Sequence, residues 1–355
     1  MDELPPAILA DILSRLSGKS LLRYRSICKR WREVIDDSYF RNSLHRLKER
    51  VVLYQENQKD KIYLIKVHEQ GAAVRIELGR FPELRGYSIE GTCNGLLLFG
   101  HVTNAENHPE LLINPFTGEV VELRRAPDLS PGKFVYGLGF DRSTGTYKMV
   151  QIKDKKTRTG TMGARIYNFN KRSWRTCEAP PLPHCTGPRH GFVFASGALN
   201  WFLKAYTMSF GLLGRAILSF DLAKEEFSFI PIPDDFSEWA HFNEGTQMHE
   251  LRGSLALVHR PDTAHIDVWV LGDYTRREWT RRYRIQLPCA NGSHYLVGPY
   301  RRDKLILHRE KDVYLYDVSK KRFTSCWTEA WTEADPHSAL FWHERLSLVS
   351  LKYGE

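Results

Sequence analysis

One repeating pattern constrains the fold of this chain more than any other feature of its sequence. Short apolar runs recur along most of the 355 residues, and the last residues of successive runs lie 45 to 54 positions apart. The six runs are Ile62–Lys66, Glu110–Asn114, Ala164–Asn168, Ile217–Asp221, Val268–Gly272 and Val313–Asp317. After five of them an apolar or aromatic residue follows six or seven positions later: Val120, Trp174, Phe227, Trp279 and Phe323. Each unit therefore predicts a strand, a polar turn and a second strand.

A second kind of hairpin lies between these units. It carries glycine at its turn, as in Cys93–Leu96, Ser196–Trp201 and Arg252–Leu257. Two hairpins in each period give four strands, and a four-stranded unit repeating about every 50 residues is typical of a β-propeller blade. We expect an all-β domain over residues 49–355, folded as a six-bladed β-propeller, with a β-sandwich as the alternative. A ring needs both chain ends in one blade, so we expect Leu346–Leu351 to pair near Val51–Tyr54.

The first 48 residues have helical spacing instead, which predicts a separate domain over residues 1–48. Apolar residues recur at steps of three and four on two segments, one starting near Pro6 and one near Leu21. The chain is therefore expected to combine a small α-helical domain with a larger all-β domain. The helices carry more large apolar side chains than so small a unit can bury in its own core. Either a partner covers that surface, or the helices form a cap packed against the rest of the chain.

The order of residues in this helical domain closely resembles an F-box. The match comprises Leu4-Pro5-Pro6, Ile8-Leu9, Ile12-Leu13, Leu16, then Lys19-Ser20-Leu21-Leu22, Cys28-Lys29 and Trp31. The resemblance implies packing onto a Skp-family adaptor, which links an F-box to a cullin scaffold in a ubiquitin ligase. The candidate adaptor-binding residues are Leu4, Pro5, Ile8, Leu9, Ile12, Leu16, Leu22 and Trp31. Some of them must fill the domain's own core, and the sequence does not sort them.

Several turn motifs of the β-domain resemble the F-box-associated, kelch-like domain of plant F-box proteins. They are Glu90–Leu97, Ile113–Gly118, Tyr136–Thr144, Ala198–Trp201 and Ile217–Asp221. The regular Gly-Gly pair of a kelch repeat is missing. The resemblance implies that this domain binds the protein to be ubiquitinated. Two long segments rich in aromatic residues carry the candidate target-binding residues, with packing between blades as the alternative for the aromatic side chains: Tyr206, Met208, Phe210, Trp239, His241 and Phe242.

The excess of basic over acidic residues suggests RNA binding as a competing function. The chain has 51 Lys and Arg against 42 Asp and Glu, a net charge of +9, which would suit a basic propeller that binds RNA. Its basic stretches, such as Arg276–Arg284, adjoin turn residues and predict solvated loop faces instead. Basic residues of the helical domain, including Arg15, Arg23 and Lys29, would favour an acidic partner. Nucleic acid is therefore not the expected ligand.

No catalytic motif stands out. Gly137-x-Gly139 is only a fragment of a dinucleotide fingerprint, and the spacing of Cys177, His184, Cys185 and His190 does not match a zinc module. We expect no cofactor, no metal and no catalytic residue. The predicted function is a non-catalytic receptor subunit that tethers a target protein for ubiquitination and degradation. A propeller scaffold that assembles proteins without ubiquitination is a further alternative.

The expected location is the cytoplasm, the nucleus or both. The N-terminal sequence is acidic and lacks the apolar core of a secretory signal, and no apolar run approaches the length of a membrane span. The six cysteines lack paired spacing, so we expect thiols and no disulfide framework. A membrane partner is not expected.

Overall fold

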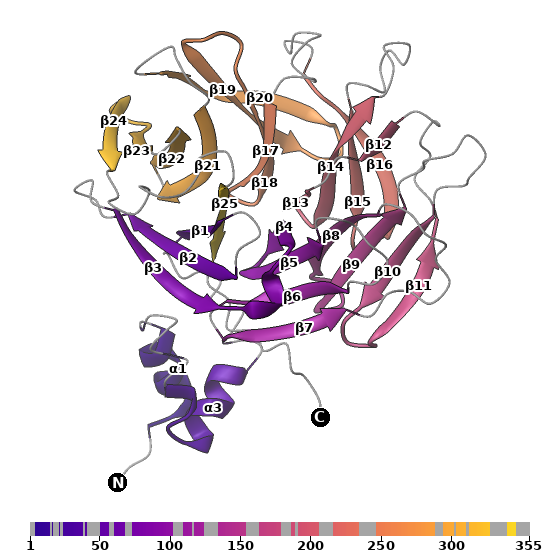
Figure 1. Cartoon of the computed structure of the whole chain (residues 1–355), viewed down its shortest axis with the longest axis vertical. Helices are drawn as coiled ribbons and strands as arrows, with labels where there is room; N and C mark the ends of the chain where they lie inside the picture. Colours follow the sequence, from indigo (N-terminus) through magenta and orange to yellow (C-terminus); the bar gives the residue numbers. More distant parts are fainter. Residues whose placement is uncertain are drawn as a thin grey trace.

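The computed structural model describes most of the chain. The described residues are 4–14, 16, 21, 24–37, 40, 50–56, 60–67, 73–101, 109–115, 117–123, 134–153, 163–178, 186–188, 191–205, 216–233, 246–287, 294–301, 303–309, 312–326 and 339–345. None of the helices among them is long and apolar enough to cross a membrane. The described chain is helical near its start and mostly β thereafter (Figure 1).

The helical part contains α1 (Pro6–Ser14) and α3 (Lys29–Asp36), which lie outside the β-domain in Figure 1. Proline at the first helical position suits α1, because its missing N–H would have had no intrahelical partner there. The backbone N–H groups of Ile8 and Leu9 both donate to the Pro5 carbonyl at 3.0 Å. The predicted helical segment near Pro6 is confirmed.

The first three sheets of the β-domain follow one another along the chain. Each is antiparallel, and neighbouring strands in its spatial order are hydrogen-bonded. The first sheet has the order β25 (Ala339–Arg345), β1 (Arg50–Glu56), β2 (Lys61–Val67) and β3 (Ala73–Arg80). The second has the order β4 (Tyr87–Cys93), β5 (Leu96–His101), β6 (Glu110–Asn114) and β7 (Glu119–Leu123). The third has the order β11 (Ser173–Cys177), β10 (Ala164–Asn168), β9 (Thr146–Lys153) and β8 (Phe134–Asp141).

Three further sheets complete the described β-structure. The fourth contains β12 (Thr186–Pro188), β13 (Val193–Ala195), β14 (Ala198–Ala205), β15 (Ala216–Asp221) and β16 (Glu226–Pro231). The fifth is β17 (Thr246–Leu251), β18 (Ser254–His259), β19 (His265–Asp273) and β20 (Glu278–Gln286). The sixth is β21 (His294–Arg301), β22 (Lys304–Arg309), β23 (Asp312–Asp317) and β24 (Arg322–Cys326). A short 3₁₀ helix, Pro82–Leu84, lies between the first and second sheets along the chain.

The sheets close into a ring through their inner strands. Strand β25 contacts β4, β4 contacts β8, β8 contacts β13, β13 contacts β17, β17 contacts β21, and β21 contacts β25. Figure 1 shows the sheets arranged around this centre in chain order. Two facing sheets would not make this cycle of contacts, so the β-sandwich alternative is wrong and the domain is a propeller.

The predicted pattern of strands within each repeat is largely confirmed. The six apolar runs lie in the third strand outward from the centre of each sheet, and the aromatic or apolar residue that follows lies in the fourth. Five of the described sheets have four strands as predicted. The fourth sheet differs because two short strands, β12 and β13, pair with different parts of β14 at the inner position.

Ring closure uses a different segment from the one predicted. Strand β25 pairs antiparallel with β1, from Arg50 opposite Arg345 to Glu56 opposite Ala339. The closing strand is therefore Ala339–Arg345, and the predicted segment 346–351 lies outside the described residues. Short apolar runs near a chain end leave the choice of pairing segment to the geometry of the ring.

The core lies between neighbouring sheets, and Gly137 and Gly139 belong to it. A Cβ at Gly137 would lie 2.5 Å from the ring of Trp201, and one at Gly139 would lie 2.4 Å from Leu222. Trp201 is fully buried, and its Nε1 donates to the Tyr136 carbonyl at 2.9 Å. The two glycines thus allow close packing of the third sheet against the fourth, which accounts for the motif without a nucleotide.

Candidate functional site

The described part of the helical domain has a small core of its own. Its buried members are Leu9, Leu13, Leu21, Ile35 and Phe40. Tyr24 and Trp31 are partly buried against this core. Their two rings meet each other edge to face, with the ring centroids 5.2 Å apart. Leu9 and Leu13 lie one turn apart on α1, so a single face of that helix is buried inward.

A neighbouring face of the same helix is apolar and exposed. Leu4, Ile8 and Ile12 follow at steps of four and are 48%, 48% and 42% exposed, while Ile27 is 60% exposed. In the part of the chain that the structure describes, these four are the exposed large hydrophobic side chains. We use the name exposed apolar face for these four side chains of the helical domain: Ile8 and Ile12 on α1, Leu4 just before it, and Ile27 in the turn before α3. Their concentration on one small domain marks a surface that a partner can cover.

The structure sorts the predicted adaptor-binding residues that it describes. Pro5 is exposed together with Leu4, Ile8 and Ile12. Leu9 is 3% exposed and belongs to the inner core, so its side chain cannot contact a partner without unfolding the domain. Leu16 and Trp31 are half-buried against that core, and Leu22 lies outside the described residues.

Ile27 is a member of the exposed apolar face that sequence reasoning did not select. Helical spacing places Ile27 with Val34 on one stripe, as if one helix continued through both. The structure has a turn at residues 26–27, and α3 begins only at Lys29. The turn leaves the Ile27 side chain exposed, and no local sequence signal distinguished it from the other residues of that stripe.

The helical domain also carries basic side chains, one of which, Arg30, contacts a residue of this face. The Arg30 guanidinium donates to the Leu4 carbonyl, which ties the start of the chain to α3. Lys29 pairs with Glu33 at 3.8 Å, and both are largely exposed. Arg32 donates to the Arg25 carbonyl at 3.5 Å. An apolar surface with a basic rim fits a partner whose groove is apolar and whose rim is acidic.

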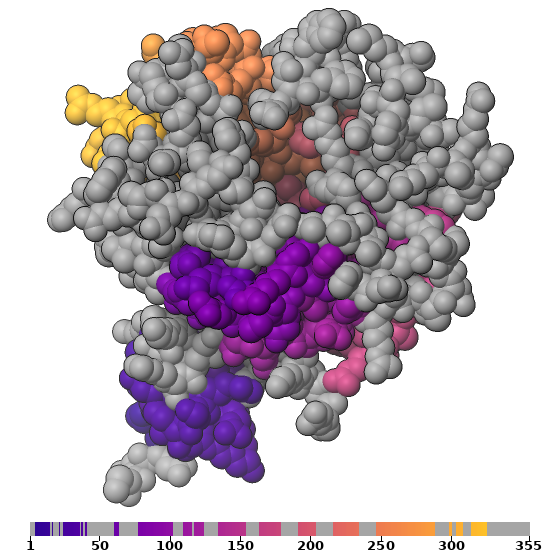
Figure 2. All heavy atoms as spheres, viewed as in Figure 1, coloured from indigo at the N-terminus to yellow at the C-terminus, as the bar shows by residue number. Residues whose placement is uncertain are grey.

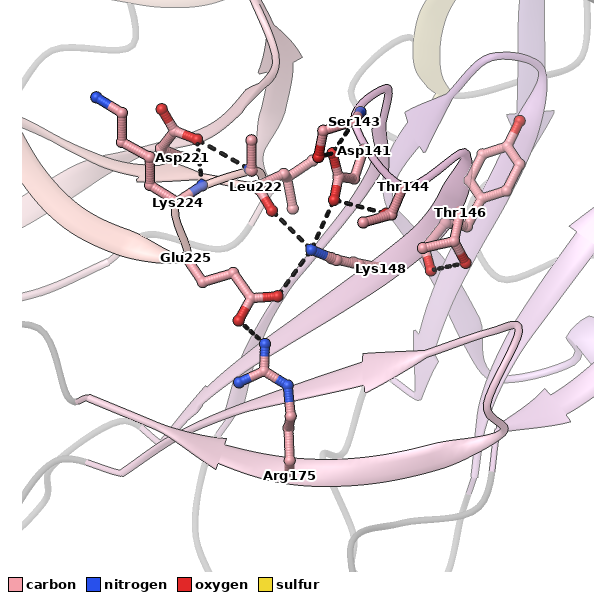
Figure 3. Close-up of polar contacts among 12 residues, drawn as sticks. Asp141, Ser143, Thr144, Thr146, Lys148, Arg175, Asp221, Leu222, Lys224 and Glu225 are labelled. Atoms are coloured by element: carbon pink, nitrogen blue, oxygen red, sulfur yellow. Dashed lines mark hydrogen bonds and ion pairs between the residues drawn. The ribbon is translucent and has the colours of Figure 1, made fainter.

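A buried ionic cluster joins the third and fourth sheets of the ring (Figure 3). The Lys148 ammonium lies 2.7 Å from Asp141 Oδ2, 2.7 Å from Glu225 Oε1 and 2.8 Å from the Leu222 carbonyl. Arg175 pairs with the other oxygen of Glu225. An ammonium has three N–H donors, and these contacts use all three.

Both carboxylate oxygens of Asp141 accept hydrogen bonds within this cluster. Its Oδ1 accepts hydrogen bonds from the backbone N–H and hydroxyl of Ser143, and its Oδ2 accepts from Thr144 at 2.7 Å as well as from Lys148. Burial alone would raise the pKa of this carboxyl, but these hydrogen bonds hold the pKa well below its usual range. With every polar atom of Lys148 and Asp141 engaged, these two buried side chains fasten the third sheet to the fourth.

A second group of buried polar side chains lies near the inner strands. The Tyr136 hydroxyl donates to Glu110, and the Gln151 amide donates to the Tyr136 hydroxyl at 3.4 Å. Burial raises the pKa of nearby Glu90 to about 7, a hydrogen bond from the Gly191 N–H opposes that rise, and the Glu110 charge adds to it. Glu90 packs closely, because a Cβ at Gly100 would lie 2.9 Å from its Oε1. Glu110, Tyr136 and Gln151 are all buried, so this group contacts other protein groups rather than solvent.

The structure describes none of the candidate target-binding residues. Tyr206, Met208, Phe210, Trp239, His241 and Phe242 all lie outside the described residues. Their segments are bounded by described strands: residues 206–215 join β14 to β15, and residues 234–245 lie between β16 and β17. Since β14 and β16 both run antiparallel to β15, both strands end at the same face of the ring.

The cysteine and histidine residues weighed as a metal site are only partly described. Burial raises the pKa of the Cys177 thiol to about 11, whereas His184, Cys185 and His190 lie outside the described residues. Among the residues that are described, no group of three or more His, Cys, Asp or Glu side chains is placed to hold a metal ion.

Comparisons with known proteins match both parts of the chain. A family model described as an F-box associated beta propeller domain matches residues 51–348, and one described as F-box-like matches residues 1–46. The Arabidopsis thaliana F-box protein CPR1 is 29% identical, over 92% of this chain and 84% of its own length. An F-box/kelch-repeat protein of the same plant is 26% identical, over 76% of each chain.

A comparison of structures gives a much weaker likeness. TolB from Acinetobacter baumannii aligns with 82% of this chain and 66% of its own, at 11% identity and a TM-score of 0.42. A likeness at that level carries no argument about function.

Proposed function

The chain belongs to the F-box proteins with an F-box associated beta propeller domain, and on that premise we propose that it is the substrate-recognition subunit of a Skp–cullin–F-box ubiquitin ligase. The observation that carries the proposal is the exposed apolar face, which a Skp-family adaptor would cover. The protein is proposed to hold a target rather than to perform chemistry. Its proposed location is the cytoplasm, the nucleus or both.

Adaptor binding would follow the physics of a helix in a groove. Side chains four residues apart on α1, Ile8 and Ile12, would enter an apolar groove together, with Leu4 and Ile27 at its borders. Full burial of an Ile or Leu side chain contributes about 1.5 to 3 kcal/mol, and these residues are already about half buried. The basic rim would then set orientation and speed of encounter more than affinity.

The propeller would hold the target. We keep the aromatic residues at 206–210 and 239–242 as the proposed contacts, because their segments begin at strand ends on one face of the ring. Loops carried by a rigid scaffold are a common place for recognition. Tethering both partners raises their effective concentration, so the lysines of the target meet a conjugating enzyme by proximity.

The test is co-purification of the full chain with a Skp-family adaptor. In the double variant Ile8→Asp, Ile12→Asp, two charges enter the exposed apolar face without entering the core, so adaptor binding should fall at least about tenfold. Ala7→Asp is the matched control, because Ala7 is also exposed on α1 but points about 100° away from Ile8. It should keep the adaptor.

The variant Leu9→Asp tests a core residue instead of an exposed one, and we expect it to unfold the helical domain. Its charge would enter the core, so helical circular dichroism and adaptor binding should be lost together. If the folded Ile8, Ile12 variant holds the adaptor as well as the parent does, the exposed apolar face is not the docking surface. If the parent itself holds no adaptor, the proposed function is wrong.

A further inference from the structure

The outermost strand of the fifth sheet carries a concentration of arginine. Strand β20 is the last in the order β17-β18-β19-β20, so one of its edges has no neighbour in that sheet. Arg281, Arg282 and Arg284 are exposed along it, and Arg276 and Arg277 are exposed in the turn before it. Figure 2 shows residues of this sheet in orange at the rim of the molecule. The basic stretch expected to be a loop is therefore mainly a strand.

An irregularity in this strand changes where one arginine points. Trp269 pairs with Arg281 and Val268 pairs with Tyr283, so Arg282 is an extra residue without a cross-strand partner. In a regular strand, residues three apart point to opposite faces, which would separate Arg281 from Arg284. The bulge shifts that alternation by one. Both side chains therefore lie on the same face.

The two arginines converge on one buried carboxylate. Arg284 grips Asp267 with two parallel hydrogen bonds, Nε to Oδ1 at 2.7 Å and Nη2 to Oδ2 at 2.6 Å. Arg281 Nη1 lies 3.7 Å from the same carboxylate, and its guanidinium carbon lies 5.7 Å from the centre of the Trp269 ring. The Asp267 side chain is 4% exposed, whereas the Arg281 and Arg284 side chains are 42% and 49% exposed.

The charge count at this site leaves a positive excess. The single negative charge of Asp267 compensates one of the two guanidinium groups. That group is Arg284, which makes both short hydrogen bonds to the carboxylate. Arg281 is held by the longer 3.7 Å approach and by the aromatic ring, and its guanidinium has more N–H donors than this one contact can use. An ordered guanidinium loses less side-chain entropy on binding an oxyanion than a solvated one does.

Backbone pairing is not how this edge would bind. Charged side chains and bulges on an outer strand oppose the addition of another strand. The binding groups are therefore the side chains. Trp279 of the same strand fastens it to the fourth sheet, since its Nε1 donates to the Pro231 carbonyl at 2.7 Å. Arginine beside tryptophan is the composition typical of interface hot spots.

We propose that Arg281 and Arg284 of β20, with Trp269 of the neighbouring strand β19, form a site for an acidic segment of a partner protein. The ligand chemistry is an oxyanion carried on a peptide, either a carboxylate of Asp or Glu or a phosphorylated side chain. If the proposed function holds, that partner is the target. Binding at this site does not itself depend on the adaptor.

The surrounding charges favour a peptide over nucleic acid. A polyphosphate needs a continuous basic stripe, and this hairpin interrupts its arginines with Asp273 and Glu278. Asp273 is 44% exposed and lies 3.7 Å from Arg276, so it neutralises the turn end of the hairpin. On the face that carries Asp267, the remaining positive excess comes from Arg281 and Arg284, which matches one or two oxyanions.

The test measures binding of the purified full chain to labelled peptides by fluorescence anisotropy. The probes are a peptide with alternating Glu and Gly, its Gln counterpart, a peptide with one phosphoserine, and a single-stranded DNA of similar length. Arg281→Gln should weaken binding of the Glu peptide about tenfold, as expected for loss of a charge-assisted contact. Arg284 is left intact in that variant, so Asp267 keeps its partner.

Two matched controls remove the same charge elsewhere. Arg282 is exposed on the same strand but is the extra residue of the bulge, and Arg142 is exposed in the turn after β8. Arg282→Gln and Arg142→Gln should each change affinity less than about threefold, with unchanged unfolding temperature in all variants. Relative affinity for the Glu and phosphoserine peptides identifies which oxyanion the site prefers.

Three outcomes would overturn the proposal. They are no binding of either acidic peptide, equal losses in all three arginine variants, and tighter binding of the DNA than of the peptides. The proposed function is judged separately by adaptor co-purification, so a chain that holds the adaptor but not the peptides loses only this inference.

Discussion

Glu90 is a residue whose pKa the fold moves into a range that is easy to titrate. Its pKa rises from 4.5 to about 7, chiefly because the carboxyl group is buried, while the Gly191 N–H opposes the rise and Glu110 adds to it. Between these values the folded chain binds a proton that the unfolded chain has released. Glu90 therefore stabilises the fold fully below about pH 4.5, and that contribution is lost as the pH rises through about 7.

The stability of the protein should therefore depend on pH through this residue. From pH 5 to pH 8, the parent should lose up to about 3 kcal/mol of unfolding free energy through Glu90, since one pKa unit corresponds to about 1.36 kcal/mol. Glu90→Gln keeps an acceptor for the Gly191 N–H but cannot ionise, so its loss should be much smaller. Urea unfolding at several pH values measures this, with exposed Glu122→Gln as the control. Parallel pH profiles for parent and Glu90→Gln would contradict the assignment.

One hairpin recurs in several sheets, between the innermost strand and the next strand outward. It is the element whose sequence and geometry agree best. Its two turn residues both have positive φ, at 50° and 80° for Asn94-Gly95, 52° and 80° for Ser196-Gly197, and 58° and 92° for Arg252-Gly253. This is the two-residue turn whose twist matches the flanking strands. Glycine recurs at the second position because a side chain there would be strained.

Gly197→Ala tests the backbone cost of this element. A Cβ at Gly197 meets nothing within 4 Å, so its φ of +80° is the only obstacle to a side chain. The variant should lose about 1 kcal/mol of unfolding free energy, the typical cost of a left-handed conformation. Gly163 also has open space but lacks a positive φ, so Gly163→Ala should be neutral or slightly stabilising. Equal denaturation midpoints for the two variants would show that the turn conformation carries no cost.

For the whole molecule, ring closure depends on pairing the two ends of the β-domain. All seven residues of β25 pair with β1, and β25 also contacts β21 and β4. Without β25, the inner edge of β1 would be exposed, and the innermost strands β21 and β4 of the neighbouring sheets would lose their contacts with the first sheet. The closing strand should therefore matter more to stability than its length suggests.

Truncation after residue 338 tests this by removing β25. The expected result is a lower unfolding temperature, a broader transition and more aggregation, measured by calorimetry and light scattering. Truncation after Arg345 keeps β25 and is the matched control, which should unfold like the parent. Cooperative unfolding of the shorter protein at the parent's temperature would mean that closure does not stabilise the ring.

The sequence by itself determined the helical start, the strands of each repeat and the glycine turns. Periodicity and turn chemistry are properties of a few neighbouring residues, so Ile217–Asp221 reads as a strand wherever it packs. The family was likewise readable from local motifs. The apolar spacing of α1 identified a surface rich in Leu and Ile, but left open which side chains face inward.

Only the tertiary structure decided which residues meet. It placed Leu9 in the core and Ile8 outside, closed the ring with Ala339–Arg345, and divided the inner strand of the fourth sheet. It also brought Lys148 to Glu225, 77 positions away, and used a bulge to turn Arg281 toward Asp267. Such contacts depend on the packing of segments far apart along the chain, and no local pattern encodes that packing.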